Sequence, residues 1–567
     1  MKKILYSFLF VFFHNVIPSQ TTSFQWVGQM GGANVDYMFF ATEIDQFSNI
    51  YTSGTLPGLG DYDPGPGVFN LSGSAGDGFI SKLDASGNFV WAKQLRCRGL
   101  CEPFAMGCDN INNIFITGNF SDSLDLNPGI SNFYVNSSGN QEAFVLKLDL
   151  NGNFVWGTSF QGITASYSTQ GYDIGVDALG NTIAIGTFGS IIDFDPGPGT
   201  FTLDSGPNGA GYIVKLSATG NLIWADQITS LSGSNIIKSV AIDASNNIIA
   251  GGEFSGVADF DPSSATYTLD ASAGNMFITK LDQNGNLIWV EQLGGNPSGL
   301  VTIWDLKLNP SGDIYIGGDI YSTVDLDPGP GVASFTSTSI DYFIVKLNPT
   351  GNYVWAKISG NPNDEEIMTM DVDASGNVYA TGIFRGTSDF DPGPGTYTLA
   401  SALGADNVFN LKLSAAGNFA WANGFVGGGY GLGIGICVDA AGSVFTTGYF
   451  NYTFDFDPSP LAQSNLTAFG FEDIFVQKMS QSATSITDKK YSSTSFLFPN
   501  PNTGQFNIQT DQNGSLEIFD LTGQIILNEK VGRGVTKINT GAISNGIYLY
   551  CFTGEDEQQQ KGKLIIE

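Results

Sequence analysis

An internal repeat constrains the fold of this chain more than any other feature of its 567 residues. One pattern recurs about every 66 residues along most of the sequence. In its clearest copy, Asp371–Gly382 reads DVDASGNVYATG, an acidic loop at Asp389–Gly395 reads DFDPGPG, and Lys412-Leu413 and Trp421 follow. Sequence repeats of this length fold as equivalent supersecondary units that pack against one another. The period therefore predicts one repeat architecture rather than several unrelated domains.

The repeat occurs seven times, and its parts are offset at the two ends. The acidic loop begins at Asp61, Asp125, Asp193, Asp259, Asp325, Asp389 and Asp455. The Lys residues are Lys82, Lys147, Lys215, Lys280, Lys346, Lys412 and Lys478. The Trp residues are Trp26, Trp91, Trp156, Trp224, Trp289, Trp355 and Trp421. The last copy has no Trp after it and the first Trp has no copy before it, so we expect Phe24–Met30 to complete the last repeat. Such pairing closes a ring and removes the exposed sheet edges of a linear array.

Each repeat reads as four short antiparallel strands. Runs of Val, Ile, Phe and Tyr alternate with Gly, Asn, Asp and Pro, and the Gly-Asn pairs suit tight hairpin turns. The sequence predicts an all-β fold: a closed seven-bladed β-propeller of four-stranded antiparallel blades, followed by a small Ig-like β-sandwich. We expect a signal peptide at residues 1–19, the propeller at 20–479, a linker at 480–495 and the sandwich at 496–567.

The N-terminus has the pattern of a secretory signal peptide. Lys2 and Lys3 precede a mostly apolar segment, Ile4–Ile17. The only histidine, His14, lies in this segment, so the mature chain is expected to lack imidazole. That loss excludes Ser-His-Asp and Cys-His mechanisms and a His-ligated catalytic zinc. No later segment is apolar and long enough to predict a transmembrane helix. The formal net charge of −31 argues against nucleic acid as a partner.

The repeats resemble a known family. Over Phe24–Met479 they are similar to the seven-bladed β-propeller repeat family of bacterial exported proteins, and the DFDPGPG loop is similar to one in surface proteins of the Bacteroidetes group. This resemblance implies a propeller fold and no settled activity.

The C-terminal region carries a second resemblance. Its motifs, in order, are Phe498-Pro499-Asn500-Pro501, the Asp520-x-x-Gly523-Gln524 turn, Gly546-Ile547-Tyr548, and Lys563-Leu564-Ile565 near the end. They resemble the type A sorting domain of the type IX secretion system, with Phe498 where the family has Tyr. The resemblance implies that the type IX machinery is a partner and carries the chain across the outer membrane. In the family this domain is often removed and the protein attached to surface glycolipid. An ordinary Ig-like module is the alternative.

The acidic loops are the strongest candidate metal sites. Two oxygen-bearing side chains two residues apart in a Gly/Pro turn, together with backbone carbonyls, suit Ca2+. The candidate ligands are Asp61, Asp63, Asp125, Asn127, Asp193, Asp195, Asp259, Asp261, Asp325, Asp327, Asp389, Asp391, Asp455 and Asp457. Alternatively, these side chains bond their own backbone and fix the turn. Seven near-identical copies favour this architectural role.

Two further features point to individual residues. Of the five cysteines, Cys97 and Cys101 lie in one loop, and export makes them a candidate disulfide. Trp304 stands outside the register of the seven repeated Trp residues. It is a candidate exposed aromatic for stacking a sugar or peptide, and core packing is the alternative.

These observations predict a binding or structural scaffold rather than an enzyme. We expect a secreted or cell-surface protein, after Sec signal-peptide cleavage and outer-membrane translocation, with an extracellular protein or glycan as ligand and no certain cofactor apart from the candidate Ca2+. The alternative function is a secreted glycan-active hydrolase or lyase that uses carboxylates. A purely structural envelope protein is a third possibility.

Overall fold

The computed structural model describes residues 21–567, except 34–40, 75, 138–140, 164–167, 295–299, 402–404, 483–495, 511, 521–523, 542 and 556–558. The expected signal peptide, His14 and most of the expected linker lie outside the described residues. The described part of the chain is all-β, as predicted, and its only helical segment is the short 3-10 turn η1 (Gly206–Asn208). By its contacts the chain divides into two compact units, Ser19–Ala483 and a second unit that contains Thr484–Glu567.

Seven four-stranded antiparallel groups, which we call repeat sheets 1 to 7 in chain order, make up the described part of the larger unit. Their first strands are β2 (Ala41–Ile44), β8 (Cys101–Cys108), β15 (Thr169–Val176), β21 (Asn235–Ile242), β25 (Leu300–Leu308), β31 (Glu365–Val372) and β37 (Gly431–Val438). Their second strands are β3 (Ile50–Leu56), β9 (Ile114–Phe120), β16 (Thr182–Phe188), β22 (Ile248–Asp259), β26 (Ile314–Tyr321), β32 (Val378–Arg385) and β38 (Val444–Phe450). Their third strands are β6 (Asp77–Leu83), β12 (Glu142–Leu148), β19 (Ala210–Leu216), β23 (Thr268–Leu281), β29 (Asp341–Leu347), β35 (Asp406–Leu413) and β41 (Asp473–Ser482). Their fourth strands are β7 (Phe89–Cys97), β13 (Phe154–Ser159), β20 (Leu222–Ser230), β24 (Leu287–Leu293), β30 (Tyr353–Ile358), β36 (Phe419–Gly427) and, for repeat sheet 7, β1 (Thr21–Gly32).

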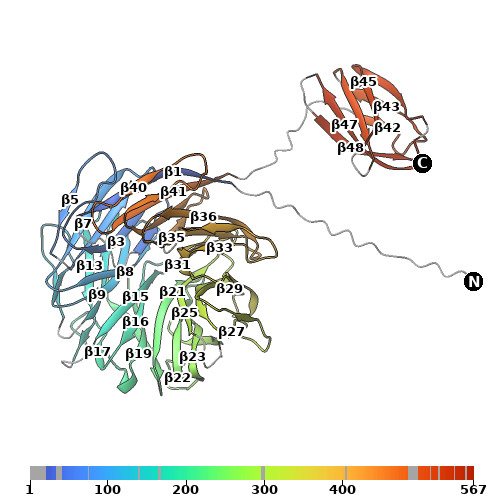
Figure 1. The fold of residues 1–567 in the computed structure, drawn as a ribbon. Helices are drawn as coiled ribbons and strands as arrows, with labels where there is room; N and C mark the ends of the chain where they lie inside the picture. The colour runs from blue at the N-terminus through green and yellow to red at the C-terminus, as the bar shows by residue number, and fades with distance from the viewer. Residues whose placement is uncertain are drawn as a thin grey trace, which may run out of the picture. The chain divides into compact units, whose positions relative to one another are not determined.

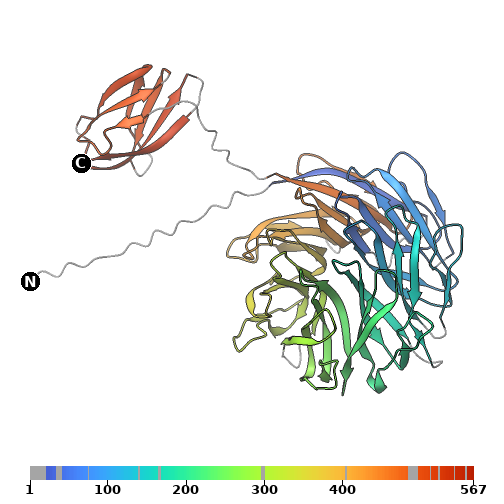
Figure 2. The same cartoon turned by 180° about the vertical axis from the view of Figure 1, so that it is seen from behind.

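The two ends of the larger unit meet in repeat sheet 7. Strand β1 pairs antiparallel with β41, with Phe24 opposite Met479 and Trp26 opposite Lys478. Figures 1 and 2 show the blue N-terminal strand beside the orange strand from the end of the unit. The first strands contact one another in a cycle, β2–β8–β15–β21–β25–β31–β37 and back to β2. We call this arrangement the first-strand cycle.

The core lies between neighbouring repeat sheets. The second and third strands of repeat sheet 1 are buried along their whole length, because both of their faces pack against other sheets. One apolar cluster, for example, joins Tyr51 and Ile80 of repeat sheet 1 to Ile116 and Phe144 of repeat sheet 2. This burial explains why these strands read as nearly continuous apolar runs.

The acidic loops connect the second and third strands of each repeat and form small hairpins. Their strands are β4 (Leu59–Asp61) with β5 (Asn70–Ser72), β10 (Ser123–Asp125) with β11 (Tyr134–Asn136), β17 (Ile191–Asp193) with β18 (Thr202–Asp204), β27 (Thr323–Asp325) with β28 (Ser334–Thr336), β33 (Thr387–Asp389) with β34 (Thr398–Ala400), and β39 (Thr453–Asp455) with β40 (Asn465–Thr467). In the fourth repeat, the ends of β22 and β23 take this place. Several hairpins pair with the preceding repeat: β4 with β1, β10 with β7, β22 with β20, β39 with β36, and β17 with the short β14 (Gln161–Gly162). The loops therefore join successive repeats.

The smaller unit consists of two antiparallel sheets. One contains β42 (Phe496–Phe498), β43 (Gln505–Thr510) and β46 (Gly534–Asn539), and the other contains β44 (Gly514–Phe519), β45 (Ile525–Val531), β47 (Gly546–Gly554) and β48 (Gln559–Ile566). A single apolar cluster includes Phe506 and Ile508 of the first sheet and Leu516 and Phe552 of the second. The two sheets thus share one core.

Candidate functional site

Three repeated residues meet where neighbouring repeat sheets touch. They are an Asp in the turn between the first and second strands, the Lys of the third strand and the Trp of the fourth. In repeat sheet 3, Lys215 Nζ lies 3.0 Å from the Asp177 carboxylate, in the turn between the first two strands. The same Nζ donates to the backbone oxygen of Gln283 in repeat sheet 4 at 3.3 Å. Trp224 Nε1 donates to that oxygen at 3.2 Å. The residues that define the repeat therefore build the contact between sheets, which is a structural role.

The contact between repeat sheets 6 and 7 differs. In repeat sheet 4 the accepting carbonyl lies in the turn between the third and fourth strands, whereas in repeat sheet 7 no turn connects the third strand, β41, to the fourth, β1. The side chain of Gln481 replaces the missing carbonyl: its Oε1 accepts from Lys412 Nζ at 2.8 Å and from Trp421 Nε1 at 3.1 Å. Its Nε2 donates to the backbone oxygen of Gly442 at 2.7 Å and to Tyr379 at 3.2 Å. Gln481 thus completes the junction at the point where the two ends of the unit meet.

The acidic loops share one set of hydrogen bonds. In the third loop, Asp193 Oδ1 accepts from Asp195 N at 3.1 Å and from Phe201 N at 2.8 Å. Asp195 Oδ1 accepts from Gly197 N at 2.8 Å. A Cβ added at Gly199 would lie 2.2 Å from Asp195 Oδ2, so a larger residue there requires the Asp195 carboxylate to move; the fourth loop has Ala265 at this place and keeps the same bonds. The double acceptor role recurs at Asp61, Asp125, Asp259, Asp325, Asp389 and, one residue longer, Asp455.

These bonds are the Asx-type turn chemistry that was the alternative to Ca2+ binding. Within the described ranges, no three His, Cys, Asp or Glu side chains are grouped so that they could hold a metal ion. Ca2+ binding by the loop residues stays the untested alternative, and these hydrogen bonds favour the architectural role.

Cys97 and Cys101 lie at the passage from β7 to β8, and both side chains are buried as free thiols in this structure. Cys97 Sγ donates to the backbone oxygen of Leu100 at 3.3 Å. Burial raises the pKa of the Cys97 thiol to about 11 and raises that of Cys101 as well. A disulfide between them in the exported protein stays a prediction.

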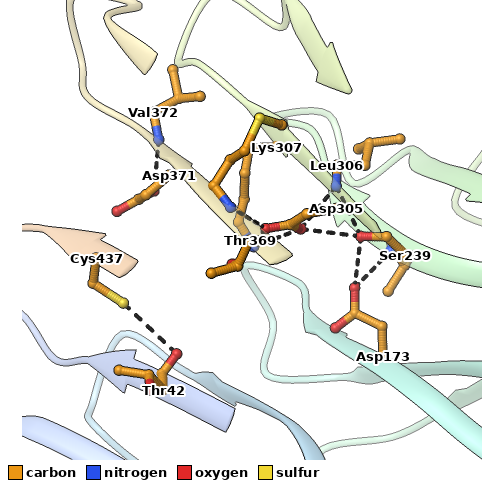
Figure 3. A network of polar contacts seen from close by, with 12 residues as sticks. Thr42, Asp173, Ser239, Asp305, Leu306, Lys307, Thr369, Asp371, Val372 and Cys437 are labelled. Atoms are coloured by element: carbon orange, nitrogen blue, oxygen red, sulfur yellow. Dashed lines mark hydrogen bonds and ion pairs between the residues drawn. The ribbon is translucent and has the colours of Figure 1, made fainter. Parts of the chain in front are cut away.

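The first-strand cycle holds a cluster of charged residues, which we call the axial cluster: Glu43, Asp173, Asp305, Lys307 and Asp371. Figure 3 shows its members Asp173, Asp305, Lys307 and Asp371 gathered from three first strands. Lys307 Nζ lies 3.1 Å from Asp305 Oδ1. Lys307 is surrounded by carboxylates, yet 39% of its side chain remains accessible to water. One ammonium therefore faces four carboxyl groups at the centre of the cycle.

Three carboxylates of the axial cluster each link their own first strand to the next one. Asp173 on β15 accepts from the backbone N–H of Val240 on β21 at 2.8 Å. Asp305 on β25 accepts from Met370 N on β31 at 2.9 Å. Asp371 on β31 likewise accepts from Val438 N on β37 at 2.7 Å. These bonds give the carboxylates a clear structural task.

Burial dominates the pKa values of three carboxyl groups of the axial cluster, Glu43, Asp173 and Asp371. It raises the pKa of Glu43 to about 7, with Lys307 opposing the rise and Asp371 and Asp173 adding to it. Burial also raises the pKa values of Asp173 and Asp371 to about 6, again against the ammonium of Lys307. The four carboxylates in turn raise the pKa of Lys307. Perturbed groups gathered in this way are candidates for function as well as for structure.

Sequence reasoning missed the axial cluster. The signal was present, because Asp305 and Lys307 interrupt the apolar residues of a first strand at two alternating positions. At the position of Lys307 the other repeats have Glu43, Gly107, Gly175, Ala241, Asp371 and Cys437. Because the repeats differ here, the position is not part of the repeated pattern that predicts the fold.

Trp304, the Trp outside the repeat register, lies on the same strand as Asp305 and Lys307. It is 40% exposed rather than packed in the core. The pairing of β25 with β26 shifts register between Ile303 and Asp305, so Trp304 is the extra residue of a β-bulge. Bulges re-aim side chains and are frequent beside functional sites.

Hydrogen bonds join the segment of the predicted sorting motif to the last strand, β48. Asn500 Nδ2 donates to the backbone oxygen of Lys563 at 2.7 Å, and its Oδ1 accepts from Ile565 N at 2.8 Å. Asn502 Nδ2 donates to the backbone oxygen of Ile565 at 3.0 Å. Phe498 ends β42 and is 40% exposed, and Pro499 and Pro501 flank Asn500. The Pro-Asn-Pro segment thus extends the edge of β48 through side chains.

Comparison with protein families identifies this C-terminal segment. A family model described as the secretion system C-terminal sorting domain matches residues 496–567. The predicted type IX sorting domain is therefore confirmed, and it implies export to the cell surface or medium. In the described part of the chain, no helix has the length and apolar character needed to cross a membrane.

Similarities outside the sorting domain are distant. The chain is 25% identical over 440 residues to an uncharacterised WD repeat-containing protein of Acanthamoeba polyphaga mimivirus, covering 64% of this chain and 31% of that protein. A protein of unknown function from Bacteroides caccae is 9% identical with a TM-score of 0.30, covering 61% of this chain and 89% of the other. PorZ, a surface component of the type IX secretion system of Porphyromonas gingivalis, is 11% identical with a TM-score of 0.21, covering 93% of this chain and 74% of the other. The chain thus spans about a third of the curated relative.

Proposed function

We propose that this protein is an extracellular binding scaffold, in which the seven repeat sheets are the blades of a closed β-propeller and the C-terminal unit directs export. The observation that carries the proposal is the sorting domain at residues 496–567. A binding role is further supported by the first-strand cycle, which brings side chains from seven repeats to one axis.

A catalytic role has less support. Asp173, Asp305 and Asp371 each use carboxylate oxygens to bond the backbone of their own and the next first strand. A general acid or nucleophile needs an oxygen free to reach the substrate. We therefore assign these carboxylates to strand positioning, and hydrolysis of a bound polysaccharide would overturn this assignment.

Labelling of intact cells tests the proposal. An antibody against the larger unit should label intact cells of the producing bacterium, or detect the protein in the medium, without permeabilisation. A strain that lacks the chain is the control. Labelling that appears only after the outer membrane is opened would place the protein inside the cell and refute an extracellular role.

A further inference from the structure

Among the described residues, six equivalent β-bulges lie around the axis of the larger unit. Each bulge lies in a first strand, and the extra residues are Phe104, Tyr172, Lys238, Trp304, Met368 and Ile434. We call them the bulge residues. Neighbours touch: the Phe104 and Tyr172 rings lie 6.2 Å apart, and Lys238 Nζ lies 4.7 Å from the centre of the Trp304 ring. They therefore form an arc of side chains at one level of the first-strand cycle.

This arc, like the position of Lys307, differs from the repeated Lys and Trp residues in one respect. The Lys of the third strand and the Trp of the fourth recur in all seven copies, whereas the bulge position holds a different residue type in nearly every copy. A structural role shared by all repeats would favour the same residue type in each copy and does not explain this variety. A single binding site on the axis would instead use different chemical groups at these equivalent positions.

The indole of Trp304 is fixed in its exposed position. Its Nε1 donates to the carboxylate of Asp319 on β26, and Asp319 Oδ1 accepts from Ile367 N on β31 at 3.1 Å. The ammonium of Lys238 covers part of one face of the Trp304 ring. It forms an ion pair with Glu253, with Nζ 2.7 Å from Oε1. A side chain anchored at its polar edge and its face loses little conformational freedom when a ligand binds.

The surrounding charges select the class of ligand. Lys238 and Glu253 neutralise each other, and Asp319 and Glu366 lie close by. These carboxyl groups, and a chain with a formal charge of −31, disfavour an anionic ligand. A cationic ligand on the indole would be repelled by the Lys238 ammonium that already lies over the ring. A neutral ligand with an apolar face and many hydroxyl groups meets neither penalty.

We propose that Trp304 is the stacking platform of a site for neutral saccharides, with Lys238 and Glu253 as hydrogen-bonding partners for sugar hydroxyls. The proposal rests on the extracellular role given above and names the ligand of that scaffold. The C–H face of a pyranose ring packs on the exposed indole, and its hydroxyls reach the ammonium and carboxylate beside it. The ion pair offers both donors and acceptors without adding net charge.

The test uses the purified full chain on an array of neutral, acidic and amino-bearing glycans, followed by titration of the best neutral oligosaccharide by calorimetry, a readout that does not depend on Trp304 itself. We expect binding to neutral glycans only. Trp304→Ala should weaken it at least about tenfold, while Trp304→Phe keeps a ring and loses less. Phe47→Ala is the matched control, because Phe47 is 67% exposed in the turn that follows a first strand and should leave binding unchanged.

Three results would overturn the proposal: no neutral glycan bound at millimolar concentration, equal affinity of Trp304→Ala and the parent, or binding only to acidic glycans or peptides. Unchanged thermal midpoints show that the variants fold, and Lys238→Ala supplies a second variant if Trp304→Ala does not. Binding by purified protein is independent of the cell-labelling experiment. Failure of export and failure of saccharide recognition are therefore distinguishable.

Discussion

At the residue scale, the side chain of one glutamine supplies the hydrogen-bond acceptor that a backbone carbonyl in a turn supplies in other repeats. In repeat sheets 2 and 3, the Lys and the Trp both bond one backbone carbonyl of the following repeat, as Lys215 and Trp224 do with Gln283. At the closure of the larger unit, the Gln481 side chain provides that acceptor and bonds four groups in all. Burial lowers the pKa of Lys412 to about 8, so this ammonium depends on its acceptor more than an exposed lysine would.

We therefore expect Gln481→Ala to destabilise the larger unit by about 2 kcal/mol, the cost of leaving a buried charged donor and an indole N–H without their acceptor. Chemical denaturation measures this change. Gln283→Ala is the matched control, because Gln283 contributes only its backbone oxygen and its side chain is exposed. Equal stability of the two variants would contradict the role assigned to Gln481.

At the element scale, the first strands carry charge where such strands are usually apolar. Glu43 on β2 faces Lys307, Asp173 and Asp371 from other first strands. Its carboxyl group accepts a hydrogen bond from the backbone N–H of Ile44 at 3.1 Å. Burial disfavours the charged form of this group. The cluster therefore couples the packing of the cycle to protonation.

Because burial raises the pKa of Glu43 to about 7 and those of Asp173 and Asp371 to about 6, the folded chain binds protons more tightly than the unfolded chain, whose carboxyl groups have ordinary pKa values of about 4. The stability these groups add is complete below about pH 4 and is lost as pH rises through 7. We expect a higher thermal midpoint at pH 5.5 than at pH 8. Glu43→Gln should flatten this dependence, whereas the exposed Glu529→Gln should not. A midpoint that rises with pH over this range would refute the assignment.

The acidic loops allow a direct comparison of turn chemistry with metal binding. Asp193→Ala removes two backbone hydrogen bonds and should cost about 1–2 kcal/mol. Asp195→Asn should be nearly neutral, since Asn127 makes the equivalent bond in the second loop. We expect millimolar Ca2+ and EDTA to give the same thermal midpoint. A Ca2+-dependent rise that Asp195→Asn reduces would show instead that the loops bind the ion.

At the scale of the whole molecule, the sequence predicted the features that recurring residues and ordered motifs specify. The all-β class and the sorting domain are confirmed, because turn residues and an ordered set of motifs specify them locally. The axial cluster was not predicted: Glu43, Asp173 and Lys307 come together only when first strands far apart in sequence meet in a cycle. The geometry of Trp304 also depended on a bulge, a register shift that the pattern of residues does not reveal.

Truncation of the chain after Ser495 tests whether the C-terminal unit directs export. In a host with a type IX secretion system, the full chain and the truncated chain are compared by the fraction of each found outside the outer membrane. We expect the full chain to reach the surface or the medium and the truncated chain, with the larger unit intact, to stay inside the cell. Equal export of the two chains would show that the C-terminal unit does not direct export.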